Sequence, residues 1–159
     1  SFADNCTRDQ KAIVAFWADG VGTYTPPGHW NAIAADDFTG LNFSEVRWAR
    51  NLALLNMTLM DAGITCWDTK YANFNTRPSQ MDPSIKTNTG VPNFPAYISG
   101  HSTFSGAAAT VLSYINPTKA NDYNEMAKQA SISRIYGALH YRSDCEVGLT
   151  QGKKVATLL

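Results

Sequence analysis

The chain has 159 residues, 44% of them hydrophobic and 16% charged, and its 13 basic residues balance its 13 acidic ones. A chain of this length buries roughly 70% of the surface of its unfolded form, so we predict a single domain over residues 1–159. The balanced charge argues against nucleic acid or an anionic membrane surface as a partner. No run approaches the roughly 18 apolar residues of a membrane span, so we do not expect an integral membrane protein.

The start of the chain and its cysteines bear on the cellular compartment. Residues 1–4 do not open the charged segment and apolar stretch of a signal peptide, and a signal peptide already removed would leave no trace. Cys6, Cys66 and Cys145 lack CxxC spacing, which argues against a metal site of cysteines and permits at most one internal disulfide. The compartment stays undetermined, with a secreted or periplasmic location favoured over the cytoplasm.

In chain order, the sequence shows helical hydrophobic spacing and no alternating strand pattern, which predicts an all-α fold. Tyr24 to Gly28 reads as a turn, Gly63 as a helix stop, and residues 79–94 as an irregular connection rich in turn formers. The expected helices are 9–18, 29–36, 44–62, 64–74, 101–114 and 121–136.

Three separate blocks contain residues suited to one oxyanion site. They are Lys70 with Arg77-Pro78, then Ser99-Gly100-His101, then Ser133-Arg134 with His140 and Asp144. An ammonium and two guanidinium groups supply fixed positive charge, and guanidinium forks match the oxygens of a phosphate-like anion. The middle block opens a predicted helix, whose unpaired N–H groups and dipole also favour an anion. We therefore predict that the three blocks meet around an oxyanion.

Each of these residues taken singly has a plainer interpretation. Lys70 and Arg77 could be solvated helix residues, and His140 a satisfied core histidine. A chance match of three blocks in the right order and spacing is improbable, which favours the site. Asp19 ends a helix, where a carboxylate is poorly placed against the dipole, and so invites an explanation. We interpret His29, which follows Pro26-Pro27-Gly28, as helping to begin a helix.

The blocks resemble the signature shared by type 2 phosphatidic acid phosphatases, bacterial class A acid phosphatases and vanadium-dependent haloperoxidases, with Ile98 where that signature usually has Pro. Residues 61–70, 94–104 and 133–140 resemble the haloperoxidases in particular, from about residue 10 to 148. This resemblance implies an all-α fold built on a four-helix bundle. Family members usually have another bundle upstream. The chain is therefore expected to be the C-terminal catalytic portion of a longer protein, incomplete on its N-terminal side, and to associate with that missing segment or with a second copy.

The resemblance also implies a vanadate cofactor and a role for each residue of the site. His140 would bond the vanadium atom, and His101 would be the acid-base group at the apical oxygen. Hydrogen peroxide and a halide would be the substrates, with hypohalous acid as the product. The residues that would hold the vanadate oxygens are Lys70, Arg77, Ser99, Gly100 and Arg134.

Three further residues take supporting roles by the same resemblance. Asp19 would pair with Arg134, and Trp67 and Phe94 would line the pocket. Asp144 is expected among the catalytic residues on its spacing: four residues after His140, it would share its helix face if the helix continues and would orient its imidazole. Lys70, besides binding oxygen, would act in catalysis by polarising the bound peroxide.

Two other functions remain open at the level of sequence. The same residues could hydrolyse a phosphomonoester without vanadate: His140 would attack phosphorus to form a phosphohistidine, Asp144 would orient it, and His101 would protonate the leaving oxygen. The longer matches around Trp67 and Phe94 favour the haloperoxidase over this phosphatase. The third possibility is a phosphate-binding remnant whose chemistry has lapsed, which the occupied catalytic positions disfavour.

Overall fold

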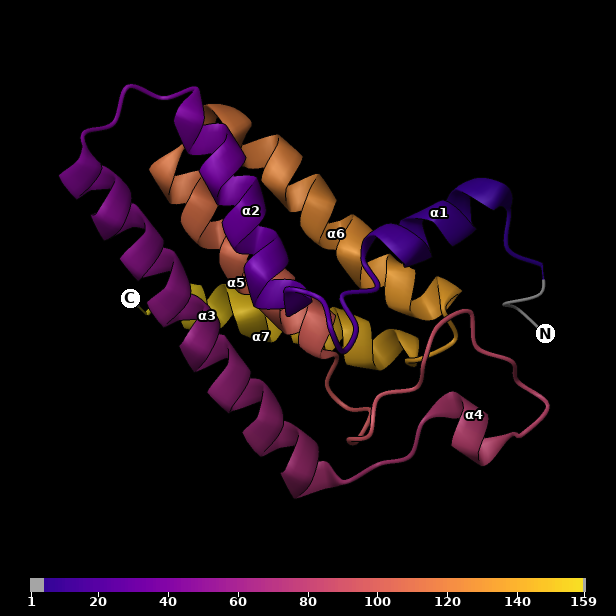
Figure 1. The fold of residues 1–159 in the computed structure, drawn as a ribbon. Coiled ribbons are helices and arrows are strands. Elements are labelled where there is room, and N and C mark those ends of the chain that lie inside the picture. The colour runs from indigo at the N-terminus through magenta and orange to yellow at the C-terminus, as the bar shows by residue number, and fades with distance from the viewer. Residues whose placement is uncertain (1–4, 159) are drawn as a thin grey trace.

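The computed structural model describes residues 5–158, and within them the chain is helical, with no strand (Figure 1). The all-α prediction is confirmed. The helices are α1 (Arg8–Phe16), α2 (Thr25–Thr39), α3 (Glu45–Asn73), α4 (Pro78–Met81), α5 (Gly100–Ile115), α6 (Ala120–Tyr136) and α7 (Arg142–Ala156), with a short 3-10 turn, Pro117–Lys119, before α6.

The structure differs from the predicted helix boundaries at three places: at Gly63, at the proline-containing segment 24–28 and at the C-terminal end. Gly63 does not stop a helix: α3 runs on to Asn73, and its C-cap, Phe74, adopts a left-handed conformation with φ 46. A Cβ at Gly63 would lie 3.2 Å from the ring of Phe104, so this glycine serves close packing instead. The expected turn at 24–28 is the first turn of α2, because prolines tolerate that position. Helix α7 was not predicted.

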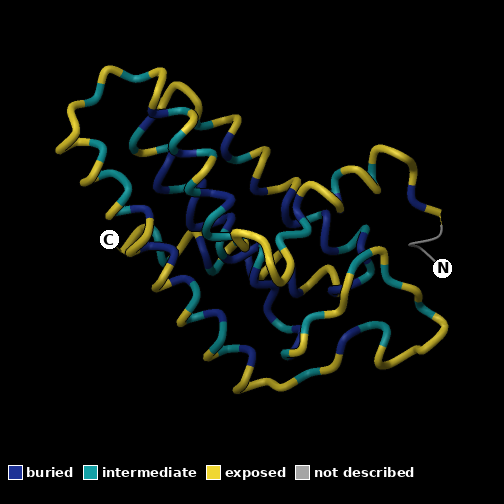
Figure 2. The backbone as a smooth tube through the Cα atoms, in the orientation of Figure 1, coloured by how far each residue is buried: buried dark blue, intermediate teal, exposed yellow. Residues whose placement is uncertain are grey.

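Helix α5 is the centre of the bundle. It packs against α2, α3, α6 and α7, and in Figure 2 most of its length is buried. The run Ala107 to Ala109 is fully buried, and these small side chains let neighbouring helices approach. Large residues from the surrounding helices complete the core; they include Trp17, Trp30, Phe38, Leu55 and Tyr123. None of the described helices is long and apolar enough to cross a membrane.

Helices α5 and α7 meet almost backbone to backbone. A Cβ at Gly152 would lie 2.0 Å from the carbonyl oxygen of Thr103, and one at Gly148 would lie 2.8 Å from that of Ser99. The Ser99 N–H also donates to the Asp144 carbonyl at 3.0 Å. These contacts fix the start of α7 against the start of α5, which is where two of the three predicted blocks lie.

The sequence left one disulfide open, and the structure does not contain it. Cys66 and Cys145 are buried free thiols, and burial raises the pKa of both. The thiol of Cys6 donates to the Tyr136 carbonyl at 3.5 Å. No two of the three cysteines are therefore bonded to each other.

We expect Gly152→Ala to destabilise the protein by about 1–3 kcal/mol, the usual cost of overpacking, because the new methyl group overlaps the α5 backbone. Urea denaturation followed by circular dichroism measures the change. Gly90→Ala is the matched control, since nothing lies within 4 Å of a Cβ there. Equal stability of the two variants would contradict the close α5–α7 contact.

Candidate functional site

A cavity of about 550 Å³ lies beside the start of α5 and is lined by residues of the second and third blocks. Lys70 and Arg77 of the first block are not among its lining residues, but Arg77 Nη1 lies 2.9 Å from His140 Nε2. The wall is formed by the α1–α2 connection with the first residues of α2, by Trp67 of α3, by the loop before α5, by the start of α5, by Arg134 of α6 and by the segment between α6 and α7. The lining residues include Asp19, Trp67, Phe94, Gly100, His101, Arg134 and His140. The sequence therefore identified residues that the fold does bring together.

Lys70 and Arg77 are buried and hydrogen-bonded to carbonyl groups. Lys70 Nζ donates to the carbonyl oxygens of Pro95 and Ala96 at 2.8 and 3.0 Å. Arg77 Nη2 donates to the Phe94 carbonyl at 3.1 Å. The relative exposures of Lys70 and Arg77 are only 0% and 1%. Neither side chain is a solvated surface residue, so the plainer interpretation fails for both.

Arg134 is equally buried, but its partner is not the one expected. Its Nη2 donates to the Trp17 carbonyl at 2.8 Å and its Nε to Ser133 Oγ at 2.9 Å. The predicted pairing of Asp19 with Arg134 is wrong, because the first turn of α2 brings His29 Nδ1 to within 3.0 and 3.1 Å of the two Asp19 oxygens. Asp19 still lies near enough to oppose the lowering of the Arg134 pKa.

The site holds more buried positive charge than negative charge. Burial lowers the pKa of Lys70 to about 8 and those of Arg77 and Arg134 to about 10. The two carboxylates of the site, Asp19 and Asp144, are each paired with a histidine at 3.0 and 2.9 Å. Within residues 5–158 no carboxylate lies within 4.0 Å of any of the three cations. Since unpaired buried charge is costly, a bound anion would stabilise this arrangement.

His140 is held from both sides. Its Nδ1 lies 2.9 Å from Asp144 Oδ2, and its Nε2 lies 2.9 Å from Arg77 Nη1. Arginine only donates, so Nε2 is the acceptor, the hydrogen is on Nδ1 and the ring is neutral. Burial lowers the His140 pKa to about 4, although Asp144 opposes the shift. A neutral Nε2 lone pair is what a vanadium or phosphorus atom would require.

The way in which Asp144 reaches His140 differs from the expectation. The two residues do not share a helix face, because His140 precedes α7 and Asp144 lies in its first turn. Asp144 Oδ2 also accepts a hydrogen bond from the Tyr141 N–H at 3.2 Å. The carboxylate therefore caps the new helix while it holds the imidazole.

His101 lines the cavity, and its Nε2 is buried. This atom has no hydrogen-bond partner and lies 4.0 Å from Asp19 Oδ2, while the Trp17 and Ala18 carbonyls oppose the lowering of the pKa of the ring. Burial, followed by the charge of Arg134, places the His101 pKa well below its usual value. His101 is therefore a neutral base at the cavity wall, available to a ligand or to a proton.

The start of α5 contributes backbone donors. Ser99 is the N-cap, and its hydroxyl accepts from the Ser102 N–H at 3.3 Å. A Cβ at Gly100 would lie 3.3 Å from the ring of Trp67, so only glycine fits here without displacement. Ile98, at the position where the family signature has Pro, is buried beside this turn and leaves Ser99 in the capping position.

Two aromatic rings cover the cations. The ring centroids of Trp67 and Phe94 lie 5.1 Å apart, and Lys70 Nζ lies 5.6 and 5.1 Å from them. Such rings restrict water near the charges, which strengthens electrostatic interactions with an anion. Both residues take the positions that the resemblance assigns to the pocket.

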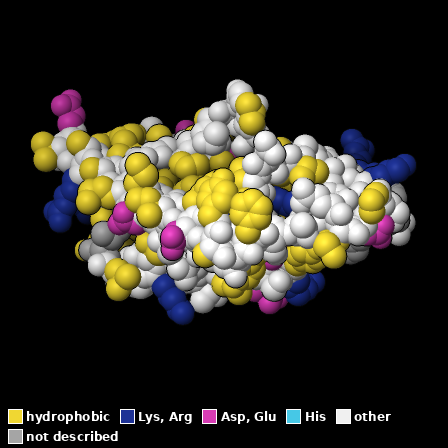
Figure 3. All heavy atoms as spheres, turned by 90° about the horizontal axis from the view of Figure 1, so that it is seen from below, with side chains coloured by type: hydrophobic (Ala, Val, Ile, Leu, Met, Phe, Trp, Pro, Cys, Tyr) yellow, Lys and Arg dark blue, Asp and Glu magenta, His cyan; other side chains and the backbone are white. Residues whose placement is uncertain are grey.

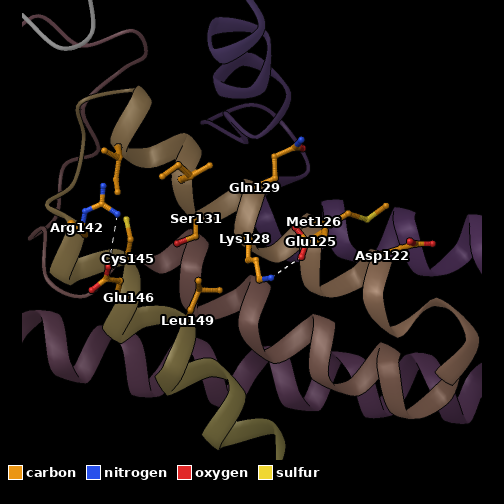
Figure 4. Close-up of a pocket in the computed structure, with 12 residues that line it drawn as sticks. Asp122, Glu125, Met126, Lys128, Gln129, Ser131, Arg142, Cys145, Glu146 and Leu149 are labelled. Carbon is orange, nitrogen blue, oxygen red and sulfur yellow. Dashed lines mark hydrogen bonds and ion pairs between the residues drawn. The ribbon is translucent and has the colours of Figure 1, made fainter.

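A second hollow, of about 650 Å³, lies between α6 and α7 (Figure 4). Both of its cations are paired: Lys128 with Glu125 at 2.6 Å, and Arg142 with Glu146 at 3.9 Å, while Asp122 adds a further negative charge. All four of these side chains are exposed. The hollow therefore lacks the buried excess charge that marks the first cavity as the candidate site.

Sequence reasoning missed His29, which it assigned to helix initiation alone. His29 is buried and takes the Asp19 carboxylate that was expected to face Arg134. No spacing rule links residues ten apart across a loop, so only the fold shows this pair. Among residues 5–158, His, Cys, Asp and Glu side chains form no group of three that could hold a metal cation, whereas the cations suit an oxyanion such as vanadate.

The chain belongs to the PAP2 superfamily, whose family model matches residues 51–159. It is 32% identical over 129 residues to the vanadium chloroperoxidase of Curvularia inaequalis, an alignment covering 62% of this chain and 21% of the relative. Structurally it resembles a bacterial vanadium-dependent iodoperoxidase, with a TM-score of 0.87 and 30% identity over 98% of this chain and 45% of the other. The chain thus spans less than half the length of these two relatives.

The fold is also shared with LpxE of Aquifex aeolicus. The TM-score is 0.75 over 99% of this chain and 88% of the other, at 16% identity. At this identity the likeness concerns the fold alone.

We expect the stability of the ligand-free protein to fall as pH drops from about 6.5 toward 4. The folded His140 pKa of about 4 lies below the usual unfolded value of about 6.5, so the unfolded chain binds more protons in this window. Complete protonation of His140 would lower the free energy of unfolding by up to about 3 kcal/mol. Urea denaturation between pH 4 and 7 measures the slope.

In this experiment His140→Asn is the matched variant, because its amide can still donate toward Asp144 but does not titrate. The variant should show a smaller decline than the parent, with His101 contributing the remainder. An identical slope in both proteins would show that His140 does not titrate in the predicted way.

Proposed function

We propose that this chain is the catalytic part of a vanadate-dependent haloperoxidase, which oxidises a halide with hydrogen peroxide to hypohalous acid. The observation that supports it most is the presence of three buried cations, none of them paired with a carboxylate, near the neutral Nε2 of His140. A negatively charged oxyanion would be attracted by these cations, and its central atom would be available for the imidazole to bond. Vanadate, a tetrahedral oxyanion with an electrophilic centre, meets both requirements.

In this proposal each group of the chain has a defined task. Lys70, Arg77 and Arg134 would hold the vanadate oxygens, together with the Ser99 hydroxyl and the Gly100 N–H. His140 Nε2 would bond the vanadium atom, after Arg77 Nη1 turns from the imidazole to an oxygen. Bound vanadate supplies a Lewis-acidic centre that activates hydrogen peroxide toward a halide.

Proton movement would fall to His101. Its lowered pKa keeps the imidazole neutral near pH 7, so it can accept a proton from incoming hydrogen peroxide. Oxidation of the halide by peroxide yields hypohalous acid and water and consumes one proton from solvent, while the proton that His101 takes from peroxide is returned within the same cycle. Lys70, close to both rings of the aromatic cover, would strengthen the polarisation of the reacting oxygen.

The alternative activity, phosphomonoester hydrolysis, uses the same atoms. His140, with its hydrogen fixed on Nδ1 by Asp144, also has the geometry of a nucleophile toward phosphorus. The choice of the haloperoxidase is supported by the two vanadium-dependent relatives at 30% identity or more and by the Trp67–Phe94 cover. A lapsed phosphate-binding remnant is disfavoured, since the site keeps a neutral His101 and an oriented His140.

The decisive experiment begins with protein freed of vanadate by chelator and of phosphate by dialysis. Orthovanadate is then added, and bromide and iodide oxidation by hydrogen peroxide is followed with a halogen-accepting dye. Phosphomonoester hydrolysis is assayed on the vanadate-free sample. We expect halide oxidation that depends on vanadate, because the buried cations bind it and His140 bonds it.

His140→Ala should lower turnover at least about 100-fold, since it removes the atom that bonds the cofactor. Lys153→Ala, at an exposed position of α7, is the control and should retain full activity. Hydrolysis that vanadate inhibits, without halide oxidation, would establish the phosphatase instead. Absence of both activities would overturn a catalytic function for this chain.

A further inference from the structure

His29 is a buried histidine with a tightly defined partner. Its relative exposure is 4%, and its Nδ1 lies 3.0 and 3.1 Å from the two oxygens of Asp19. A carboxylate only accepts, so His29 Nδ1 carries the hydrogen. The ring stacks on Trp17 at 4.5 Å and meets the edge of Phe16 at 4.8 Å. His29 therefore cannot turn away from the carboxylate without losing these contacts.

The carboxylate that His29 holds faces His101. Asp19 has a left-handed backbone conformation, with φ 44, and lines the cavity. Its Oδ2 is 4.0 Å from His101 Nε2, a nitrogen without another hydrogen-bond partner. Hydrogen bonds at catalytic groups are often long before a ligand binds, so this distance is within reach of contact. His29, Asp19 and His101 thus form a chain from the core to the cavity.

We propose that His29 is a positioning residue for the acid-base step: it fixes Asp19 so that the carboxylate stabilises and orients His101 when that ring gains a proton. This inference rests on the proposed function. The other charged or titratable groups near His101 are Arg134 and His140, and Arg134 opposes its protonation. The Trp17 and Ala18 carbonyls favour the proton, and Asp19 Oδ2, 4.0 Å from His101 Nε2, is the carboxylate placed to join them when the ring is charged. His29 itself touches no oxyanion-binding residue other than through Asp19.

Two substitutions separate the packing of the His29 ring from the hydrogen bond that its Nδ1 donates to Asp19. His29→Phe keeps a ring against Trp17 but removes the hydrogen bond, whereas His29→Asn keeps a donor near Nδ1 and removes the ring. We expect His29→Phe to lower kcat by about 10–100-fold while the KM for hydrogen peroxide and the affinity for vanadate stay unchanged. His29→Asn should recover most of kcat. Equal loss in both variants, or a loss of vanadate affinity with kcat retained, would overturn the assignment.

A second measurement keeps this inference separate from the proposed function. The chain has three histidines, so the imidazole nitrogens of ¹⁵N-histidine-labelled protein give few NMR signals that single substitutions assign. The His101 signal should move in His29→Phe and return in His29→Asn, even if no enzyme activity is found. An unmoved His101 signal in folded His29→Phe would refute the positioning role, whatever the reaction proves to be.

A different feature is an apolar stripe on the outer face of α3. Its members are separated by three, four, seven or eleven residues, which places them on one side of the helix and at its C-cap: Val46, Met57, Met60, Ile64, Tyr71 and Phe74, with exposures of 79, 59, 66, 62, 55 and 70%. Figure 3 views the molecule from below Figure 1 and shows hydrophobic side chains gathered over much of that face. Exposed apolar groups at this spacing indicate a surface that packs against another helix.

Hollows on both sides of the stripe deepen this surface. One, of about 690 Å³, is bordered by Met57 and by Tyr114 of α5. The other, of about 580 Å³, is bordered by Met60, Ile64 and Phe104. α3 thus stands as a ridge between two apolar grooves, which is the shape that interdigitates with a similar ridge.

The charges along one edge of the stripe select the partner. With 3.6 residues per turn, Arg47, Arg50, Asp61 and Asp68 fall along the same edge, and all four are exposed. The two arginines lie toward the N-terminal end of α3 and the two aspartates toward its C-terminal end. When two α3 helices face each other in antiparallel orientation about a two-fold axis, the same edges meet with their ends reversed. The basic end of each helix then lies against the acidic end of the other.

We infer that this stripe binds a second copy of the chain, α3 against α3 in antiparallel orientation. A two-fold dimer needs a self-complementary surface, and both the apolar ridge and the charged edge satisfy that condition. The charges contribute chiefly to orientation, since exposed ion pairs are individually weak. The apolar contacts supply the affinity.

Sedimentation equilibrium of the 159-residue protein over a range of concentrations tests this. We expect a monomer–dimer equilibrium whose dissociation constant rises more than about tenfold in Ile64→Glu, because each dimer would bury two such carboxylates. Val147→Glu, at an exposed apolar position of α7, is the control and should leave the equilibrium unchanged.

Charge reversal tests the orientation separately. Arg47→Asp with Arg50→Asp should weaken the dimer, and the further changes Asp61→Arg with Asp68→Arg should restore it. A protein that stays monomeric at every concentration would overturn the inference and point to a helical segment of another polypeptide as the occupant. A dimer insensitive to Ile64→Glu, or unrestored by the second pair of changes, would show that the α3 stripe is not the antiparallel interface.

Discussion

The burial of three cations without carboxylate partners is the constraint on which the site depends. Lys70, Arg77 and Arg134 lie inside the bundle, and carbonyl groups at the ends of helices and in the loop before α5 satisfy their hydrogen bonds. Carbonyl dipoles orient a cation but do not neutralise it. The fold thereby keeps buried positive charge beside the cavity, and an oxyanion bound there would offset the energy that this costs in the free protein. In the proposed function, stability and ligand affinity would be coupled through the same three side chains.

Close helix packing brings the parts of this site together. Glycines at the α5–α7 contact let the two backbones touch, and the Ser99 N–H bonds to the Asp144 carbonyl across it. The block that opens α5 and the block that opens α7 are therefore joined by main-chain contacts, independently of any ligand. Such a site is preorganised: His140 and the Gly100 N–H do not have to find each other when the anion arrives.

The two histidine–carboxylate pairs give the cavity two different sides. Asp144 holds the hydrogen of His140 on Nδ1 and leaves Nε2 available toward the anion. On the opposite side, Asp19 is held by His29 and faces His101, whose pKa is held low by burial. In the proposed function one imidazole would bond an electrophilic atom and the other would accept a proton.

The sequence by itself determined the helical class and the composition of the oxyanion site. Helical spacing and the order of the three blocks are local properties, so they are visible without coordinates. It did not determine whether Gly63 ends a helix, because the glycine is needed there for close packing against the ring of Phe104 from α5, which is distant in the sequence. Helix α7 was missed since its start is stabilised by Asp144, which was assigned wholly to His140.

Only the tertiary structure decided which carboxylate serves which cation or imidazole. Asp19 is near Arg134, but the first turn of α2 delivers His29 to it at bonding distance, and no sequence spacing predicts that meeting across a loop. The outward apolar face of α3 likewise became visible only when the other face was seen to fill the core. Residue types and their order set which chemistry is possible, whereas partners are chosen by packing, since a side chain bonds whichever group the folded backbone brings within reach.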